Sequence, residues 1–153
     1  MDQQQIKEFI TKNLPRHKEF VLATTDGEGR PWAVALNLCY DTQFNIIWHS
    51  EKGTEHSKHI GERPEVAICV FSDFKDIGDF GLYIQATTYE ITDEAELREK
   101  LKLRFEQKGK PVPSPTDYLG DSTSRLYCAT ITRAWVNDQS HSKQEVDLDI
   151  LRS

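Results

Sequence analysis

Six strand-like runs joined by short turns constrain the fold of this chain more than any other feature of its sequence. The runs are rich in β-branched and aromatic residues, and Gly, Pro, Asn, Asp and Ser, which favour turns, lie between them. They span residues 19–25, 32–40, 44–50, 65–72, 81–92 and 125–138. The first three are predicted to form an antiparallel meander, and residues 73–80 are predicted to form a polar loop.

Helices are predicted at the edges of this pattern. Apolar residues recur at helical spacing over residues 3–14 and predict an amphipathic helix. Asp93 and Glu96 form a capping box for a second helix over residues 93–108. The apolar side of that helix is predicted to carry Ala95, Leu101 and Phe105. Residues 109–124 concentrate Pro, Gly and Ser, which predicts a mobile loop or a segment that contacts a partner.

The order of these elements determines the fold class. Antiparallel strands joined by short turns cannot form the parallel βαβ array of a doubly wound fold. We therefore predict a mainly β chain, a six-stranded antiparallel Greek-key barrel with peripheral helices. At 153 residues the chain is long enough for one domain, residues 1–153, with a core of its own.

The run 32–40 separates bulky side chains from small ones. One face carries Trp32, Val34, Leu36, Leu38 and Tyr40, and the other carries Ala33, Ala35, Asn37 and Cys39. The bulky face is predicted to fill the barrel. The small face allows a ring system or a second subunit to approach the backbone, although a covering helix is the alternative.

Charge and cysteine content exclude several classes of protein. With 19 Lys and Arg against 25 Asp and Glu, the net charge is −6 and no basic stripe marks a surface for nucleic acid or anionic membranes. No apolar run approaches the ~20 residues of a membrane span, and a signal peptide is not evident, so a cytoplasmic location is expected. Cys39, Cys69 and Cys128 lie in strand-like runs without C-x-x-C spacing, which predicts reduced core thiols.

The stretch "EKGTEHSKHIGERPEVA" (51–67) predicts a loop followed by a helix. Gly53 permits a tight approach, and Thr54 suits the N-cap of a helix that begins near Glu55. The first free N–H groups of such a helix point at any anion bound there. The alternative is an ordinary helix start without a ligand.

Histidines make a metal or haem site the competing hypothesis at this stretch. His49, His56 and His59 are close in sequence, and the last two share a helix face, a spacing compatible with zinc or haem. No Cys or carboxylate completes a zinc pattern, so no metal site is predicted. A nucleophilic Cys–His site is not expected either, because a thiol in mid-strand has a raised pKa and little access.

Four stretches, in this order and spacing, point to a known family: "VLATTDGEGRPWAVALNLCYD", "IIWHS", "G-T-x-x-S-K-x-I" and "RPEVAICV". Together they resemble the pyridoxamine 5′-phosphate oxidase-like flavoproteins, the FMN-binding split-barrel family, over residues 19–92 and more loosely over 123–138. The resemblance implies a homodimer with two FMN molecules at the subunit interface. It places the FMN phosphate and ribityl chain at Ala33, Val34, Ala35, Leu36, Trp48, His49, Ser50, Thr54, His56 and Ser57.

The chain departs from the family pattern at the phosphate position. The family usually has S-R-K where this chain has Thr54, Glu55 and His56, so the Arg and Lys that pair with a phosphate are replaced. Glu55 repels a phosphate if it faces inward, and His56 is charged only below its pKa, near 6.5 when unperturbed. Lys52 and Lys58 are the cations that remain to compensate.

The resemblance implies an FMN-dependent oxidoreductase acting on a small molecule, with the flavin rather than a side chain carrying the redox step. The true oxidase also uses carboxy-terminal arginines and a Trp, but this chain has Trp135 and no Arg between Arg133 and Arg152, so vitamin B6 oxidation is not expected. Trp135 is predicted to stack near the flavin of the partner subunit, with a barrel-closing tryptophan as the alternative. A non-catalytic dimer that has lost FMN affinity and a haem-binding relative are the other hypotheses.

Overall fold

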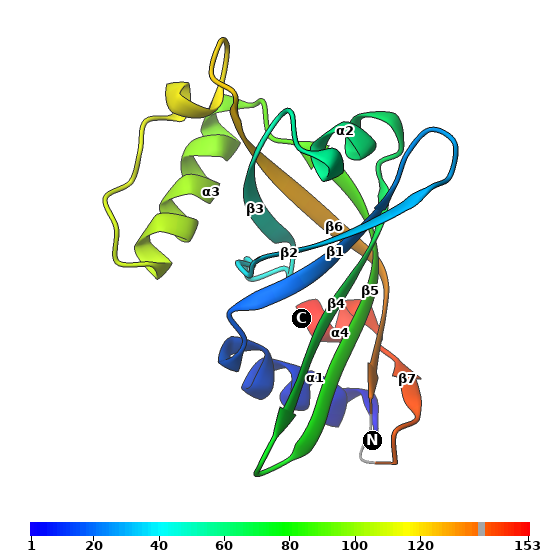
Figure 1. Cartoon of the computed structure of the whole chain (residues 1–153). Coiled ribbons are helices and arrows are strands. Elements are labelled where there is room, and N and C mark those ends of the chain that lie inside the picture. Colours follow the sequence, from blue (N-terminus) through cyan, green and yellow to red (C-terminus); the bar gives the residue numbers. More distant parts are fainter. Residues whose placement is uncertain (138–139) are drawn as a thin grey trace.

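The computed structural model describes residues 1–137 and 140–153. Its strands are β1 (Glu19–Thr25), β2 (Pro31–Asn37), β3 (Ile46–Glu51), β4 (Glu65–Phe74), β5 (Gly78–Glu90), β6 (Ser124–Asn137) and β7 (Lys143–Glu145). Its helices are α1 (Gln3–Asn13), α2 (Glu55–Glu62), α3 (Glu94–Gln107) and α4 (Leu148–Arg152), with the 3-10 turns η1 (Leu14–Arg16) and η2 (Pro115–Tyr118). Figure 1 shows a strongly twisted sheet with the helices around it.

The strands form one antiparallel sheet, which confirms the mainly β prediction. Its order is β2-β1-β4-β5-β6-β3, and β7 pairs with the last residues of β6. The strands β2 and β3 end this order, and a single bridge between Tyr40 and Ile46 connects their ends of the sheet. The pairing of the described strands does not close the sheet, so the six-stranded Greek-key barrel stays a prediction.

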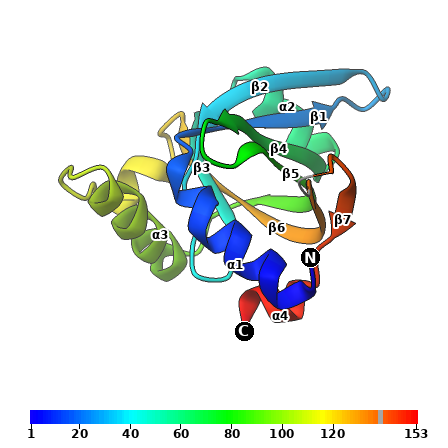
Figure 2. The same ribbon diagram turned by 90° about the horizontal axis from the view of Figure 1, so that it is seen from below.

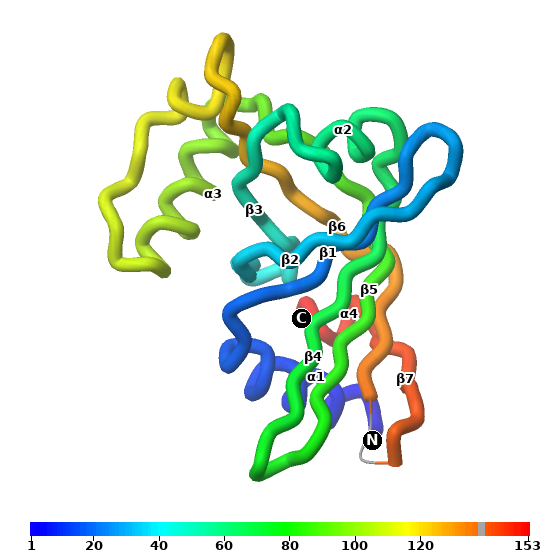
Figure 3. The backbone as a smooth tube through the Cα atoms, in the orientation of Figure 1, coloured from blue at the N-terminus to red at the C-terminus, as the bar shows by residue number. Residues whose placement is uncertain are grey.

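Three details of the predicted connectivity differ from the structure. The predicted step from 32–40 to 44–50 is confirmed only at the turn that joins them, where Tyr40 bridges Ile46 and the Ile47 N–H donates to the Cys39 carbonyl at 2.9 Å, whereas β3 pairs along its whole length with β6. The main core covers one face of β3 and α3 covers the other. Residues 73–80 are not a loop: β4 and β5 form a long hairpin, clear in Figure 3, whose turn uses Gly78 at φ 73. The short, polar β7 was not predicted, and the predicted end of the last strand at residue 138 lies outside the described residues.

The alternation predicted for residues 32–40 is confirmed over residues 33–38, where the small side chains are exposed and the larger ones are half-buried or buried. Leu38 and Cys39 are both buried, because β2 has ended and the chain turns toward β3. Cys39 therefore does not belong to the small face. Trp32 is 46% exposed and does not fill the core as predicted.

The main core lies between the inner face of the sheet and the helices α1 and α4. Figure 2 shows these two helices side by side below the sheet. Asp2 and Gln5 form a capping box at the start of α1, which orients Ile6 and Ile10 toward the sheet. The largest fully buried side chains of this core are Trp48, Phe20, Phe80, Ile6, Ile10, Leu22 and Val70. No helix in the described part of the chain is long and apolar enough to cross a lipid bilayer.

A second, smaller core joins α3 to the other face of β3 and β6. The predicted cap is confirmed, since the Asp93 side chain accepts a hydrogen bond from the Glu96 N–H at 2.9 Å. The predicted apolar face of α3 is confirmed at Leu101, which is buried, and at Phe105, which packs half-buried against this core, but Ala95 is exposed. The other buried residues of the helix are Leu97 and Arg104. The segment after α3 is not wholly a loop, since η2 packs its tyrosine into this core.

Candidate functional site

The start of α2 has the geometry of a helix that can accept an anion. Thr54 has extended φ and ψ angles of −70° and 154°, and its side-chain oxygen accepts a hydrogen bond from the Ser57 N–H at 3.4 Å. This confirms the predicted N-cap. The N–H groups of Glu55 and His56 precede the first intrahelical bond, which the Lys58 N–H donates to the Thr54 carbonyl. They remain available to an acceptor at the helix start.

His56 lies beneath this helix start and is only 6% exposed. Its Nε2 lies 2.6 Å from Ser50 Oγ, on β3, and 3.3 Å from Thr54 Oγ1. Burial lowers the pKa of His56, and the charge of His59 lowers it further. The imidazole is therefore neutral near pH 7, and it offers a hydrogen bond rather than a positive charge at this position.

The lowered pKa of His56 makes stability depend on pH. Below its ordinary pKa, near 6.5, the unfolded chain takes up a proton that the folded chain refuses, so stability falls as the pH falls from about 7. The slope from this one group is at most about 1.4 kcal/mol per pH unit. Urea unfolding between pH 7.5 and 5.5 should show a shallower dependence in H56Q than in the unaltered protein. Equal slopes would show that His56 titrates alike in both states.

His59 lies one turn further along α2 and connects the helix to β1. Its Nδ1 lies 2.9 Å from Thr24 Oγ1, and its Nε2 lies 3.6 Å from a carboxylate oxygen of Glu55. Lys58 Nζ also lies 3.6 Å from Glu55. The Glu55 side chain therefore points along its own helix toward Lys58 and His59 and not across the helix start.

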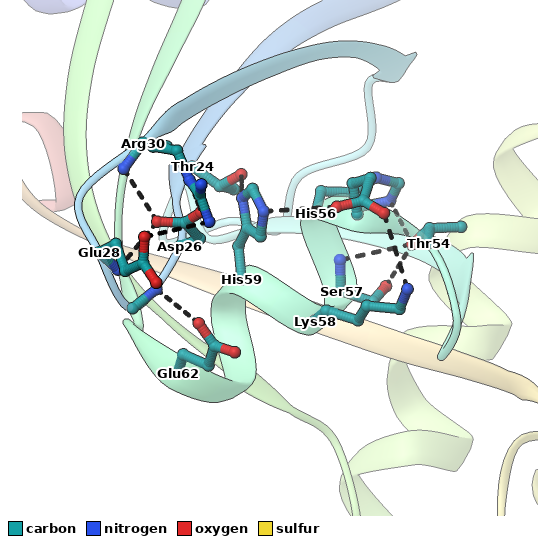
Figure 4. Close-up of polar contacts among 12 residues, drawn as sticks. Thr24, Asp26, Glu28, Arg30, Thr54, His56, Ser57, Lys58, His59 and Glu62 are labelled. Carbon is teal, nitrogen blue, oxygen red and sulfur yellow. Dashed lines mark hydrogen bonds and ion pairs between the residues drawn. The ribbon is translucent and has the colours of Figure 1, made fainter.

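The far end of α2 is fixed to the turn between β1 and β2. The Gly27 N–H donates to Glu62 at 2.5 Å, and Arg63 donates to the Gly27 carbonyl at 2.8 Å. Within that turn Asp26 and Arg30 form an ion pair at 2.7 Å (Figure 4). Both ends of α2 are thus tied to strands, which fixes the direction of the helix start.

A hollow of about 300 Å³ borders α2 on the side of β5 and β6. Lys52 and Ser57 line it from the helix side, together with Thr88, Tyr89, Glu90 and Tyr127 from the strands. Sequence reasoning missed the strand residues, because they come from runs far along the chain and carry no motif. The hollow places one cation, Lys52, beside the helix start.

The outer face of the sheet, the face turned away from α1 and α4, is largely apolar. A row of laterally paired residues crosses it: Ala35, Val21, Cys69, Tyr83 and Trp135. A hollow of about 280 Å³ opens between Val21, Trp135 and the two alanines of the next row, Ala23 and Ala67. We call this set, with the exposed Phe71, the outer apolar face.

The predicted site residues fall into three places. Ser50, Thr54, His56 and Ser57 meet at the start of α2, whereas Ala33 and Ala35 lie on the outer apolar face with Trp135. The half-buried Val34 and Leu36 point to the main core. On β3, Trp48 is buried in the core, which leaves only its backbone for a ligand, and His49 points to the α3 side against Tyr118.

Metal ligands do not gather in the described residues. No group of three His, Cys, Asp or Glu side chains is placed to hold an ion among residues 1–137 and 140–153. His56 and His59 each bind a hydroxyl group instead. All three cysteines are free: Cys39 and Cys128 are buried, and Cys69 is half-buried on the outer apolar face.

The family model of pyridoxamine 5′-phosphate oxidase matches residues 3–137, which include every strand from β1 to β6. The chain belongs to the pyridoxamine 5′-phosphate oxidase family. This confirms the resemblance drawn over residues 19–92 and, more loosely, over 123–138. No curated protein matches the chain by sequence.

Solved structures share the fold of this family member at low sequence identity. A heme binding protein from Mycobacterium smegmatis is 12% identical with a TM-score of 0.69, and the match covers 99% of this chain but only 60% of that one. A Clostridium acetobutylicum protein related to general stress protein 26 of B. subtilis, of the pyridoxinephosphate oxidase family, is 10% identical with a TM-score of 0.66 and coverages of 97% and 98%. HutZ, the heme storage protein of Vibrio cholerae, is 17% identical with a TM-score of 0.60 and coverages of 93% and 94%.

Proposed function

We propose that this chain is an FMN-binding flavoprotein, a single split-barrel domain that works as a homodimer and acts as an oxidoreductase on a small molecule. The observation that carries the proposal is the start of α2. It offers free N–H groups and the hydroxyls of Thr54 and Ser57 at the positions where the family resemblance places the FMN phosphate. The free thiols support a reducing compartment, the cytoplasm.

The residues at the helix start fit a phosphate, although they do not supply the usual Arg and Lys. The Glu55 carboxylate points toward Lys58 and His59, so its repulsion of an anion bound at the helix start is reduced. Lys52 lines the adjoining hollow and Lys58 stands on the first turn. A neutral His56 cannot pair with a dianion, so we expect weaker FMN binding than with the family's usual pair.

The outer apolar face supports the dimer. Val21, Trp32 and Phe71 are large apolar residues left exposed in the single chain, and the first and third lie on or beside the alanine rows. A contiguous apolar surface of this kind is typical of an interface. The alanines leave room for a flat ring against the sheet, and Trp135 adds an aromatic wall.

When bound, FMN supplies hydride or electron transfer at its ring, and the chain supplies binding and orientation. Pyridoxamine 5′-phosphate oxidation itself is not part of the proposal. Arg133 pairs with Glu145 at 2.9 Å, and Arg152 donates to the carbonyls of Gln43 and Ile131. Neither arginine is free to hold a substrate in the single chain.

Titration of the apoprotein with FMN and with riboflavin tests the phosphate site. E55R should tighten FMN binding about fivefold, a gain of ~1 kcal/mol for a charge-assisted contact. T54V should weaken FMN binding because it removes the hydroxyl at the helix start. Riboflavin lacks the phosphate, so neither change should alter its affinity. Quenching of flavin fluorescence measures both.

T54S is the matched control, since it keeps the hydroxyl and the N-cap that T54V loses. Loss of the cap alone costs about 0.5–2 kcal/mol of stability, so unfolding is measured for each variant in parallel. If FMN and riboflavin respond alike to E55R, the phosphate does not bind at the start of α2.

The absorption spectrum of the purified protein separates this function from its two alternatives. A bound flavin gives absorption bands in the blue and in the near-ultraviolet, and bound haem gives a Soret band. A non-catalytic dimer gives neither, and it retains no flavin bands when added FMN is removed again. Haem is the second candidate because two proteins of similar fold are named for it. The hydroxyl partners of His56 and His59 weigh against either histidine as its axial ligand.

A further inference from the structure

An arginine occupies a core position on α3. The buried face of this helix runs Leu97, Leu101, Arg104, and Arg104 is only 5% exposed. Its guanidinium makes one long hydrogen bond, from Nη1 to the Ile47 carbonyl at 3.4 Å. Within residues 1–137 and 140–153 it has no carboxylate partner, although a guanidinium carries five N–H donors. A buried arginine without a counter-ion is rare, because the desolvation of its charge is uncompensated.

The other buried cations of the chain show what is missing. Lys100, one turn earlier on the same helix and half-buried, lies 2.8 Å from the half-buried Asp41. Arg125, on β6, lies 2.8 Å from Glu90. Arg104 alone of the three lacks such a partner among the described residues, so its environment is incomplete.

The surroundings of Arg104 add positive charge instead of neutralising it. Lys108 follows one turn later at the end of α3, and His49 projects from β3 on the α3 side, with its ring 5.4 Å from that of Tyr118. Burial lowers the pKa of Arg104. Burial and the charge of Arg104 lower the pKa values of Lys108 and His49.

Nearby negative groups do not remove the imbalance. Glu51 is the carboxylate closest in sequence to His49, and it binds the Ser124 hydroxyl at 3.1 Å. The carboxyl end of α3 contributes a partial charge of about −0.5, which is too small to neutralise the full positive charge of even one of these cations. No nitrogen of Arg104 is both fully enclosed and without a hydrogen-bond partner in the described part of the chain. The N–H groups that make no hydrogen bond therefore reach the edge of the packed region.

We propose that Arg104, Lys108 and His49 form a binding site for a small anion, a phosphate or carboxylate group, between α3 and β3. Figure 1 shows α3 beside β3, on the side away from α2, so this site is separate from the one at the α2 start. The guanidinium would bind two oxygens of the anion with its fork of N–H groups, and Lys108 would close the site from the solvent side. The bound anion would complete the environment of Arg104.

NMR titration of the full-length, 15N-labelled protein tests this proposal. Sodium phosphate and sodium acetate are added separately at constant ionic strength, and the two arms separate a phosphoryl from a carboxylate ligand. At least one anion should produce saturable shifts in the backbone signals of residues 47–49 and 104–108. R104M should weaken that binding at least tenfold. R98M is the matched control: Arg98 lies on the exposed side of α3, pairs with Glu94 and should leave the shifts unchanged.

Two further measurements keep the test decisive. Without added anion, R104M should unfold at a higher urea concentration than the unaltered protein, because an unpaired buried charge has been removed. A purely structural arginine predicts the opposite. K108Q alters an exposed side chain and should weaken the binding severalfold. The proposal is overturned if neither anion gives saturable shifts at these residues, or if the shifts persist unchanged in R104M or in K108Q.

Discussion

Replacing Val21 with glutamate is expected to convert the proposed dimer into monomers. Val21 is 43% exposed in the single chain and lies at the centre of the outer apolar face, beside Cys69 and Ala35. The substitution buries an unpaired carboxylate in the interface, and a two-fold dimer carries it twice. At about 2 kcal/mol per subunit the dissociation constant should rise roughly a thousandfold. Sedimentation velocity at micromolar concentration, with FMN present, measures the change.

V112E is the matched control for this experiment. Val112 is also 43% exposed, but it lies in the segment between α3 and η2 and not on the outer apolar face. The same substitution there should leave the dimer intact. A monomer in the unaltered protein, or a dimer that persists in V21E, would show that the outer apolar face is not the interface.

The parts of the fold that were predictable from sequence are those governed by local signals. The N-caps Asp93 and Thr54 were found from residue type and spacing, and most strands were found from their β-branched runs. Strand order is not a local property, so the prediction found the turn that brings Tyr40 beside Ile46 but missed β6 as the main partner of β3. The two strands of the β4–β5 hairpin were predicted, but their extension into residues 73–80 was missed because this end of the hairpin is polar and its turn is followed by a glycine with positive φ.

The candidate site was predictable to a similar extent. The sequence order brings Thr54, His56 and Ser57 to one helix start, and the prediction placed them together. It did not show that Glu55 would bend back along its helix, since that depends on side-chain contacts with Lys58 and His59. On α3 it found Leu101 and Phe105 but not Arg104, because Arg104 occupies a position where the apolar pattern predicts a hydrophobic residue.

Replacing Trp48 with alanine is expected to cost about 3–5 kcal/mol of stability. Trp48 is fully buried between Phe20 and Tyr127, at ring distances of 5.8 and 5.9 Å. The alanine variant leaves a cavity in the centre of the main core that the surrounding sheet cannot fill by relaxing. The free energy of unfolding in urea measures the loss.

W48F separates the two parts of this effect. The Trp48 Nε1–H is enclosed and has no acceptor among the described residues, and burying such a donor costs about 1–3 kcal/mol. Phenylalanine removes that donor and keeps most of the ring, so W48F should cost less than about 1.5 kcal/mol. A loss in W48F as large as that in W48A would mean that the N–H is hydrogen-bonded in solution.

The same pair of variants tests how the core supports the site. Trp48 precedes Ser50 by two residues on β3, and Ser50 Oγ holds His56 at 2.6 Å under the start of α2. A cavity at Trp48 should let this end of β3 shift, so W48A should weaken FMN binding even at temperatures where it is folded. W48F keeps the strand in place and should bind FMN normally. Equal FMN affinity in both variants would show that the contact from β3 is not needed to hold the start of α2 in place.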